Sequence, residues 1–186
     1  MTSPELDQAL TKYQHLANQV NLAFENLRLS YPDDLQCRAG CHQCCLPNLS
    51  MSQLEAKAIQ QFLSANPEVT KQLTVLEQQK PHQGRRCNLL NESEQCGIYD
   101  ARPIICRSHG VSVLFQTTEN KGQQKWFADV CELNFTVSSS AELRQADFLL
   151  SEGINQFIAE LNHSLGFTAE RTKLSVSELL STGPTK

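Results

Sequence analysis

The sequence has 186 residues and a formal net charge of -4 at pH 7. A chain of this length can bury a real hydrophobic core, and we expect one domain over residues 1–186. The acidic balance is unlike the basic surface of a nucleic-acid-binding protein, so no nucleic-acid partner is expected. No apolar stretch approaches the ~20 residues of a membrane helix, and the amino terminus resembles no secretory signal. We therefore expect a cytoplasmic protein with no membrane partner.

Residues 4–29 are expected to form a long first helix. Pro4 suits a first helical turn, and apolar residues recur at spacings of three and four. These residues are Leu6, Leu10, Tyr13, Ala17, Val20, Phe24 and Leu27. The stripe could be the seam of a dimer, but we favour packing onto the protein's own core.

Two shorter helices are expected next, near residues 51–64 and from residue 67 to Pro81. Ser52 and Glu55 have the spacing of a capping box at the first, and Asn66 suits the N-cap of the second. Their inner faces would carry Leu54, Ala58, Ile59 and Phe62, and then Val69, Leu73 and Leu76.

Residues 111–118 and 124–130 are rich in β-branched and aromatic residues, which predicts a hairpin around a turn at 119–122. A last long helix is expected over 140–164, capped by Ser139 and Glu142. Its stripe would be Leu143, Ala146, Leu150, Ile154, Phe157 and Leu161.

A short terminal helix is expected at 176–181. Ser175 and Glu178 would form its capping box, and Leu174 and Leu179 a hydrophobic staple around it.

The expected fold class is therefore mainly α, a small single domain of about five helices with one short β-hairpin and two cysteine-rich loops. The loops, residues 30–49 and 81–110, contain few apolar residues that could organise them by packing. A metal would supply the missing ordering free energy. We expect the two loops to form a metal site, with its motif core at 37–131 between the flanking helices 4–29 and 140–164.

The eight cysteines are the strongest functional signal in the sequence. Four lie in the run CRAGCHQCC and four follow at wider spacing: Cys37, Cys41, Cys44 and Cys45, then Cys87, Cys96, Cys106 and Cys131. Disulfides rarely persist in a reducing cytosol, and inert burial explains lone cysteines rather than clusters. We therefore interpret all eight as candidate metal ligands.

Cys44 and Cys45 are consecutive, so their side chains diverge in a helix and point to opposite faces of a strand. One tetrahedral ion would not easily take both. Either they belong to different sites or they ligate different irons of a cluster. Eight thiols could supply two four-thiolate sites or one site with spare cysteines, and either a zinc ion or an iron-sulfur cluster is expected as the cofactor.

Other residues could support the cysteines. Five arginines lie within four residues of a cysteine and could compensate thiolate charge: Arg38, Arg85, Arg86, Arg102 and Arg107. His109 follows Cys106 after a two-residue gap and is the best histidine candidate for a ligand, ahead of His42 and His82. Arg102 could bind an anion or a thiolate, or it could pair with Asp100 or a backbone carbonyl.

The ordered pattern CRAGCHQCC, then RRCNLLNESEQCGIYDARPIICR, then Cys131 resembles the YkgJ-type cysteine-cluster family. The resemblance covers about residues 37–131 and includes Ile98, Tyr99, Arg102, Pro103 and Arg107 as well as the cysteines. It implies a zinc- or iron-chelating domain. One family member is a flagellin lysine N-methylase, so protein methylation is an implied activity. The segment Asn88-Leu89-Leu90 departs from a proline-containing run that is usual there.

Three functions remain open from the sequence. The first is a metal- or cluster-binding protein. The second is a cluster-dependent enzyme that modifies proteins, methylase-like or redox. The third is a structural zinc module that presents helices to a partner. The spacing C-x3-C-x2-C also occurs in radical S-adenosylmethionine enzymes, but the chain lacks the alternating strands and helices of their barrel.

Overall fold

A computed structural model of the chain describes residues 3–79, 86–118, 124–137 and 142–181. The α-helices of this part are α1 (Pro4–Ser30), α2 (Gln53–Ala65), α3 (Pro67–Gln79), α4 (Ile104–Ser108), α5 (Ser151–Ser164) and α6 (Val176–Ser181). The strands are β1 (Ser50–Met51), β2 (Val113–Thr118), β3 (Gln124–Asp129), β4 (Leu149–Leu150) and β5 (Thr172–Lys173). Short 3₁₀ turns lie at η1 (Tyr99–Ala101) and η3 (Gln145–Asp147). The architecture is helix-rich, as predicted; a single domain over residues 1–186 stays a prediction.

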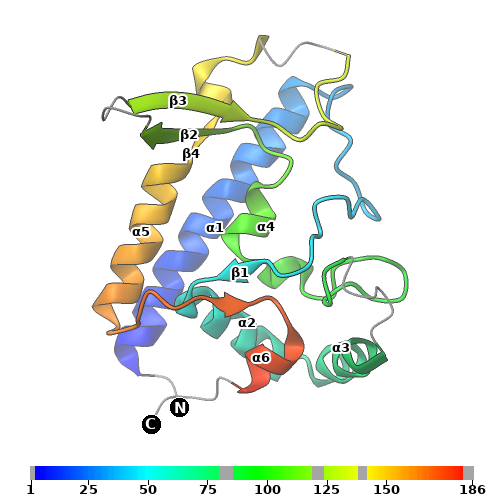
Figure 1. The fold of residues 1–186 in the computed structure, drawn as a ribbon, viewed down its shortest axis with the longest axis vertical. Coiled ribbons are helices and arrows are strands. Elements are labelled where there is room, and N and C mark those ends of the chain that lie inside the picture. Colours follow the sequence, from blue (N-terminus) through cyan, green and yellow to red (C-terminus); the bar gives the residue numbers. More distant parts are fainter. Residues whose placement is uncertain (1–2, 80–85, 119–123, 138–141, 182–186) are drawn as a thin grey trace.

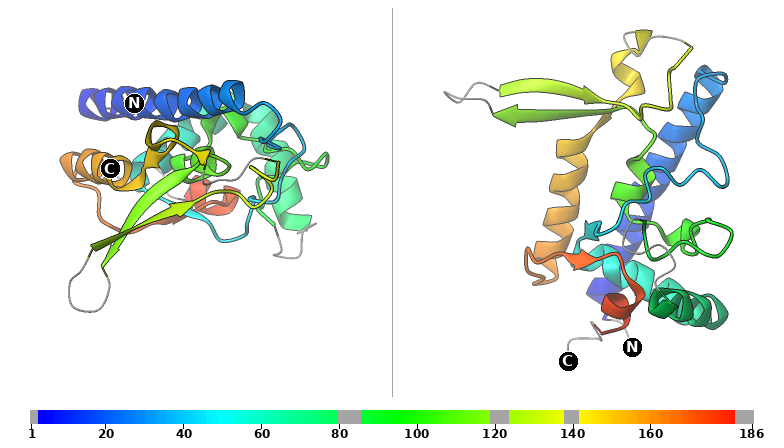
Figure 2. Two further views of the ribbon diagram at one scale, coloured as in Figure 1. Left: turned by 90° about the horizontal axis from the view of Figure 1, so that it is seen from above. Right: turned by 45° about the vertical axis from the view of Figure 1, so that its right-hand side comes forward.

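The long helix α1 lies along one edge of the molecule when it is seen from above (Figure 2). The hydroxyl of Ser3 caps it by accepting a hydrogen bond of 3.2 Å from the amide of Leu6. The predicted stripe, including Tyr13, Ala17 and Val20, is buried against residues of α2, α4 and α5. The stripe therefore packs onto the protein's own core, which is the alternative that we favoured over a dimer seam. None of the helices in the described ranges combines the length and hydropathy needed to cross a membrane.

The capping box at the start of α2 is confirmed. The hydroxyl of Ser52 accepts from the amide of Glu55 at 3.3 Å, and the amide of Ser52 donates to Glu55 Oε2 at 2.9 Å. The second carboxylate oxygen, Oε1, accepts from the buried amide of Ile104 at 2.9 Å. Glu55 is only 4% exposed, so it ties the first turn of α4 to the first turn of α2. The predicted second helix is also present, as α3.

The predicted hairpin is confirmed as β2 and β3, which project from the body (Figure 2). Phe115 lies opposite Phe127, and their rings stack with centroids 5.8 Å apart. The expected turn at 119–122 lies outside the described residues. The described residues also contain two short β-pairings beyond this hairpin. The other edge of β2 pairs in parallel with β4, and β1 pairs antiparallel with β5.

The last long helix begins at Ser151 and not near residue 140, so its predicted start was wrong. The backbone before Ser151 is already bonded elsewhere, since the amide of Leu149 donates to the carbonyl of Ser112 at 2.9 Å. The buried face of α5 carries Ile158 and Leu161, whereas the predicted Phe157 is 37% exposed. The proposed cap Ser139 lies outside the described residues.

The second cysteine region is not irregular throughout. It contains η1 and the short helix α4, which packs against α1 (Figure 1). Pro103 is buried at the N-cap of α4, where its lack of an amide proton costs nothing. Residues 81–85 of this region lie outside the described ranges. The helix carries Cys106, one of the candidate metal ligands, and ends before His109.

The terminal helix α6 is present at the predicted position, with a modified cap. The hydroxyl of Ser175 accepts from the amide of Glu178 at 3.2 Å, but the Glu178 carboxylate accepts from the amide of Lys173 at 2.9 Å. Leu174 and Leu179 are buried in one core with residues of α2 and α3. The main members of this core, which we call the α2–α3–α6 core, are Met51, Ile59, Leu63, Leu73, Leu89, Leu90, Ile98, Leu174, Val176 and Leu179.

Candidate metal centre

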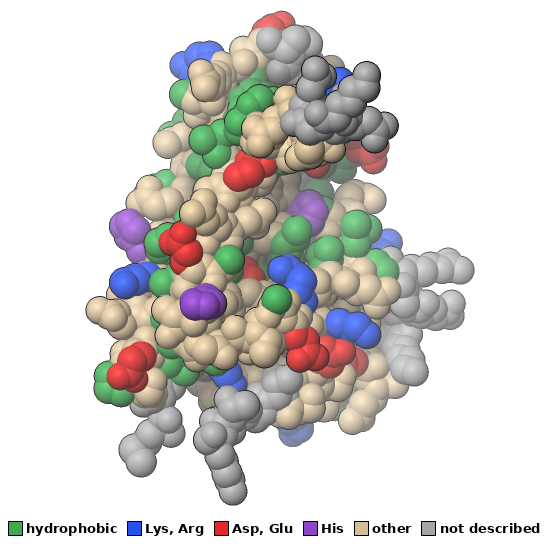
Figure 3. Space-filling model, turned by 60° about the vertical axis from the view of Figure 1, so that its left-hand side comes forward, with side chains coloured by type: hydrophobic (Ala, Val, Ile, Leu, Met, Phe, Trp, Pro, Cys, Tyr) green, Lys and Arg blue, Asp and Glu red, His purple; other side chains and the backbone are tan. Residues whose placement is uncertain are grey.

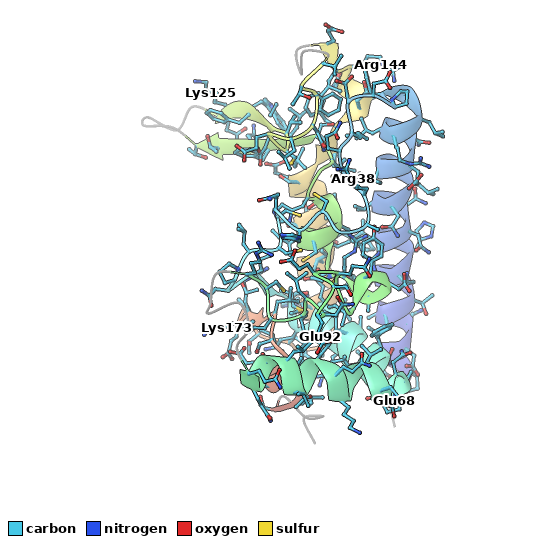
Figure 4. All side chains as sticks on the ribbon, turned by 90° about the vertical axis from the view of Figure 1, so that its right-hand side faces the viewer. Arg38, Glu68, Glu92, Lys125, Arg144 and Lys173 are labelled. Atoms are coloured by element: carbon cyan, nitrogen blue, oxygen red, sulfur yellow. The ribbon has the colours of Figure 1, made fainter. Side chains whose placement is uncertain are left out.

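The first cysteine loop is a series of tight turns. The amide of Cys41 donates to the carbonyl of Arg38, and the amide of Cys45 to that of His42, each at 2.9 Å. Gly40, which lies within the first of these turns, has φ +87°, a left-handed conformation that favours glycine. These turns shape the segment that carries the four cysteines of the run, each of which is partly exposed. In Figure 4, Arg38 marks this loop and Glu92 the second cysteine loop, which lies nearer to α3.

The second loop is bent back on itself, so that Cys87 and Cys96 come close. Leu90 and Cys96 form an antiparallel bridge, and the amide of Gly97 donates to the carbonyl of Leu89 at 2.8 Å. A Cβ on Gly97 would lie 2.8 Å from the side chain of Leu73, so only glycine fits this approach to α3 without a shift. The loop is therefore packed onto the α2–α3–α6 core.

The two loops meet through the backbone. The amide of Cys87 donates a hydrogen bond of 2.9 Å to the carbonyl of Cys45. Six of the eight cysteines line one cavity of about 400 Å³ between these segments and α4: Cys41, Cys44, Cys45, Cys87, Cys96 and Cys106. We call it the cysteine cavity. All eight cysteines are free thiols in the structure.

Cys37 and Cys131 lie outside the lining of this cavity and are linked by Asn134. The side-chain amide of Asn134 approaches Cys37 Sγ at 3.6 Å and donates to the carbonyl of Gly110 at 2.8 Å. Its carbonyl oxygen accepts from the amide of Gln36 at 2.9 Å, and its own backbone amide donates to the carbonyl of Cys131 at 2.9 Å. Asn134 is 5% exposed. One buried side chain thus joins three segments.

No pattern in the sequence pointed to Asn134 as a supporting residue. A single asparagine three residues after a cysteine has no distinctive pattern. Its partners are 24 and 97 positions away, and only the fold brings them together.

Arg102 and Arg107, which flank Cys106 in the pattern that resembles the cysteine-cluster family, have different roles. Arg107 is buried and donates to the backbone carbonyls of Asp100 and Arg102 and to Asn21 Oδ1, so it holds the turn before Cys106. Arg102 lines the cysteine cavity. Its guanidinium lies 3.5 Å from the centroid of the exposed Tyr99 ring and donates to the Tyr99 carbonyl at 2.9 Å. Arg102 therefore contributes positive charge at the cavity, while Arg107 acts on the backbone.

The remaining arginines are spread around the loops. Arg38 is exposed but lines the cysteine cavity, and Arg86 pairs with Glu94 on the second loop. Arg85 lies outside the described residues.

The surroundings of Cys44, Cys87, Cys96 and Cys106 favour the protonated form of these thiols. Burial raises the pKa of Cys87 to about 11 and also raises the pKa of Cys96 and Cys106. The pKa of Cys44 is raised mainly by a hydrogen bond with Cys45 and, to a smaller extent, by burial. Arg102 opposes the rise in the pKa of Cys44, Cys96 and Cys106. A metal cation would have to displace these protons, because thiolate is the form that ligates.

The donor set suits a soft metal, since thiolates select zinc and iron-sulfur centres. Within the ranges that the structure describes, no three Cys, His, Asp or Glu side chains are already arranged to hold a metal ion. Metal binding would therefore require the cysteine side chains to move closer together. The first loop, a series of turns whose cysteines are only partly buried, can make such a movement at low cost.

His109 lies where the cysteine cavity meets a second, larger groove. It lines the cysteine cavity, and its Nδ1 atom is buried without a hydrogen-bond partner among the described residues. Burial lowers the pKa of His109, which favours the neutral ring that ligates metals. By contrast, His42 Nδ1 lies 2.9 Å from the carbonyl of Gly40. His82 lies outside the described residues.

A larger groove of about 1450 Å³ adjoins the cysteine cavity and shares Cys44 and His109 with it. Its walls come from α4, α5, β2 and the segment 129–133, which includes Cys131. Figure 3 shows this side of the molecule, where hydrophobic side chains gather below the hairpin. The groove therefore gives access to the cysteine-bearing segments from the α5 side.

A model of one protein family matches residues 36–132 of the chain, a span that contains all eight cysteines. No curated protein matches the chain, and neither does any solved structure. The family name spells two residues between its first two cysteines, whereas Cys37 and Cys41 are separated by three. The match covers more than half of the chain and agrees with the cysteine-cluster resemblance. The chain therefore belongs to the CxxCxxCC family, described as "Putative zinc- or iron-chelating domain".

Proposed function

We propose that this chain is a metal-binding protein that holds zinc or an iron-sulfur cluster through its cysteines. The observation that carries the proposal is the convergence of six thiols from three separate segments on one cavity with Arg102 on its wall. Membership in a family described by zinc or iron chelation supports metal binding in general. Eight free thiols also fit a reducing, cytoplasmic setting.

Elemental analysis of anaerobically purified protein, combined with its visible spectrum, tests the proposal. Charge-transfer absorption together with iron and acid-labile sulfide would identify a cluster. Colourless protein with bound zinc would identify an ion. Wild-type protein that contains neither metal and takes up neither would contradict metal binding.

Cys41→Ser tests the assignment to the first loop. We expect this variant to lose bound metal, because the first loop would then lack one of its thiolates. Gln43→Ser is the matched control, since Gln43 is exposed on the same loop and carries no thiol. Equal metal content in both variants would show that Cys41 is not a ligand.

The groove supports a second candidate function, a metal-dependent enzyme that modifies a protein or performs redox chemistry. Cys44 and His109 lie on the walls of both hollows, so a substrate in the groove would approach the metal ligands. An enzyme of this kind needs an open coordination position. Cobalt-substituted protein whose absorption changes on addition of imidazole would support this candidate. An unchanged spectrum would favour a closed site without catalysis at the metal.

A further inference from the structure

We propose that the imidazole of His109, through its Nδ1 atom, is a ligand of the metal centre in the cysteine cavity, beside the thiolate of Cys106. This assignment rests on the proposed metal-binding function. It adds a nitrogen ligand to a site that is otherwise built from thiols, and it places that ligand where the cavity meets the groove.

The Nδ1 atom of His109 is a buried polar atom that the protein leaves unsatisfied. Within the described residues, three buried side-chain atoms lack a hydrogen-bond partner: Tyr13 Oη, His109 Nδ1 and Glu152 Oε2. Of these three residues, His109 is the one that lines the cysteine cavity. Burial lowers the pKa of His109, and the nearby Ile105 carbonyl opposes this without making a hydrogen bond of normal geometry to Nδ1. Buried polar atoms normally have partners, and a metal ion in the cavity would supply the one that Nδ1 needs.

The backbone holds His109 next to Cys106. Cys106 lies in α4, and His109 is the residue that ends this helix, after a two-residue gap. Zinc sites often take two ligands that a short gap of this kind separates. On the other side of His109, the carbonyl of Gly110 accepts a hydrogen bond of 2.8 Å from the buried side-chain amide of Asn134. The fold therefore fixes the chain both before and after the proposed ligand.

The surroundings of His109 supply the thiols that a mixed centre needs. His109 shares the lining of the cysteine cavity with six cysteines, which include Cys106. Cys44 and His109 are the two residues that line both this cavity and the groove. Three thiolates with one imidazole form a common donor set for zinc, and imidazole replaces thiolate on an iron of some iron-sulfur clusters. A nitrogen ligand at this position therefore suits either metal.

The other histidines of the described ranges lack this combination of features. His15 is exposed on α1 and lines neither the cavity nor the groove. His42 Nδ1 already lies 2.9 Å from the carbonyl of Gly40. His163 is exposed and lines the groove but not the cysteine cavity. His163 is therefore a matched control for His109, because it shares the groove and not the thiols.

X-ray absorption at the edge of the bound metal tests the assignment, because it separates sulfur from nitrogen ligands for zinc and for iron alike. Wild type, His109→Ala and His163→Ala would be purified without a histidine tag and without imidazole. We expect one imidazole nitrogen per metal centre in the wild type. His109→Ala should lose this nitrogen, whereas His163→Ala should keep the wild-type spectrum.

His109→Cys covers the case in which His109→Ala releases its metal, and we expect it to keep the metal with sulfur ligands alone. A wild-type spectrum with sulfur ligands only would overturn the proposal and leave water as the partner of Nδ1. Nitrogen that persists in His109→Ala, or disappears from His163→Ala, would also overturn it. Wild-type protein without metal would instead refute metal binding itself, so the two failures are distinguishable.

Discussion

The backbone amide of Cys87 donates a hydrogen bond of 2.9 Å to the carbonyl of Cys45, joining the two cysteine loops directly. A backbone bond fixes the relative position of the loops without using either thiol. Both sulfur atoms remain available for ligation, and both line the cysteine cavity. The structure therefore brings the loops together through groups that metal binding does not consume.

Gly110→Ala is expected to weaken metal binding. Gly110 has φ +89°, and a Cβ there would lie 2.5 Å from Cys37 Sγ. Gly40→Ala is the matched control, because Gly40 has φ +87° but a Cβ there would meet nothing within 4 Å. Both variants should lose about 1–2 kcal/mol of stability from the left-handed backbone. Only Gly110→Ala should also displace Cys37, which competition with a chelator would detect as weaker metal retention. Equal metal retention in the two variants would contradict this reading of the contact.

Asn134→Ala is expected to lower both stability and metal retention. The variant removes the side-chain partner of the Gln36 amide and of the Gly110 carbonyl. This should lower the free energy of unfolding by about 1–3 kcal/mol. Asn162→Ala is the matched control: Asn162 is also buried and bonds the amide of Leu54 and the carbonyl of Ile158, away from the cysteines. Denaturant unfolding and chelator competition would be measured together. A similar loss of metal in both variants would mean that Asn134 acts only through general stability.

Asp147 predicts a pH dependence of stability. The guanidinium of Arg144 and the hydroxyl of Tyr31 hydrogen-bond to its carboxylate, and the Arg144 contact is the main reason that its pKa falls from 3.8 to about 2. Because the folded state has the lower pKa, the contact stabilises the fold above about pH 4. That contribution is lost as the pH falls from there towards 2.

Thermal unfolding between pH 5 and pH 2 checks the prediction for Asp147. The melting temperature of Asp147→Asn should fall less steeply with decreasing pH than that of the wild type. Glu68→Gln, which changes an exposed carboxylate on α3, should keep the wild-type slope. Parallel curves for Asp147→Asn and the wild type would refute the assigned contribution.

Metal removal should loosen the cysteine loops before the long helices. Residues 31–49 and 86–103 contain no α-helix and are shaped mainly by turns, with Leu89, Leu90 and Ile98 of the second segment packed in the α2–α3–α6 core, whereas α1 and α5 are held by regular helical hydrogen bonds and buried stripes. Hydrogen exchange with and without a chelator would show faster exchange in those two segments and little change in α1 and α5. Unchanged loops, or equal loosening throughout, would argue against ordering by metal.

Local patterns were sufficient for the elements with clear caps and stripes. Ser52 and Glu55 lie three residues apart, and their capping bonds depend on little beyond that spacing. The same holds for the stripe of α1, whose burial matches its period. Prediction failed over the described residues 142–150, because an apolar period typical of a helix is outweighed there by pairing of β4 with β2. That pairing joins residues far apart in the sequence, and no local pattern records it.

The sequence by itself determined the supply of eight thiols, the crowding of seven of them in two loops and the family to which they point. These properties depend on residue type and short spacing, which are local. Only the tertiary structure decided which thiols share a cavity, that Asn134 joins Cys37 to the Cys131 segment, and that Glu55 bonds the start of α4. Such contacts depend on how distant segments pack, and the free energy that selects them belongs to the whole fold and not to any short stretch of chain.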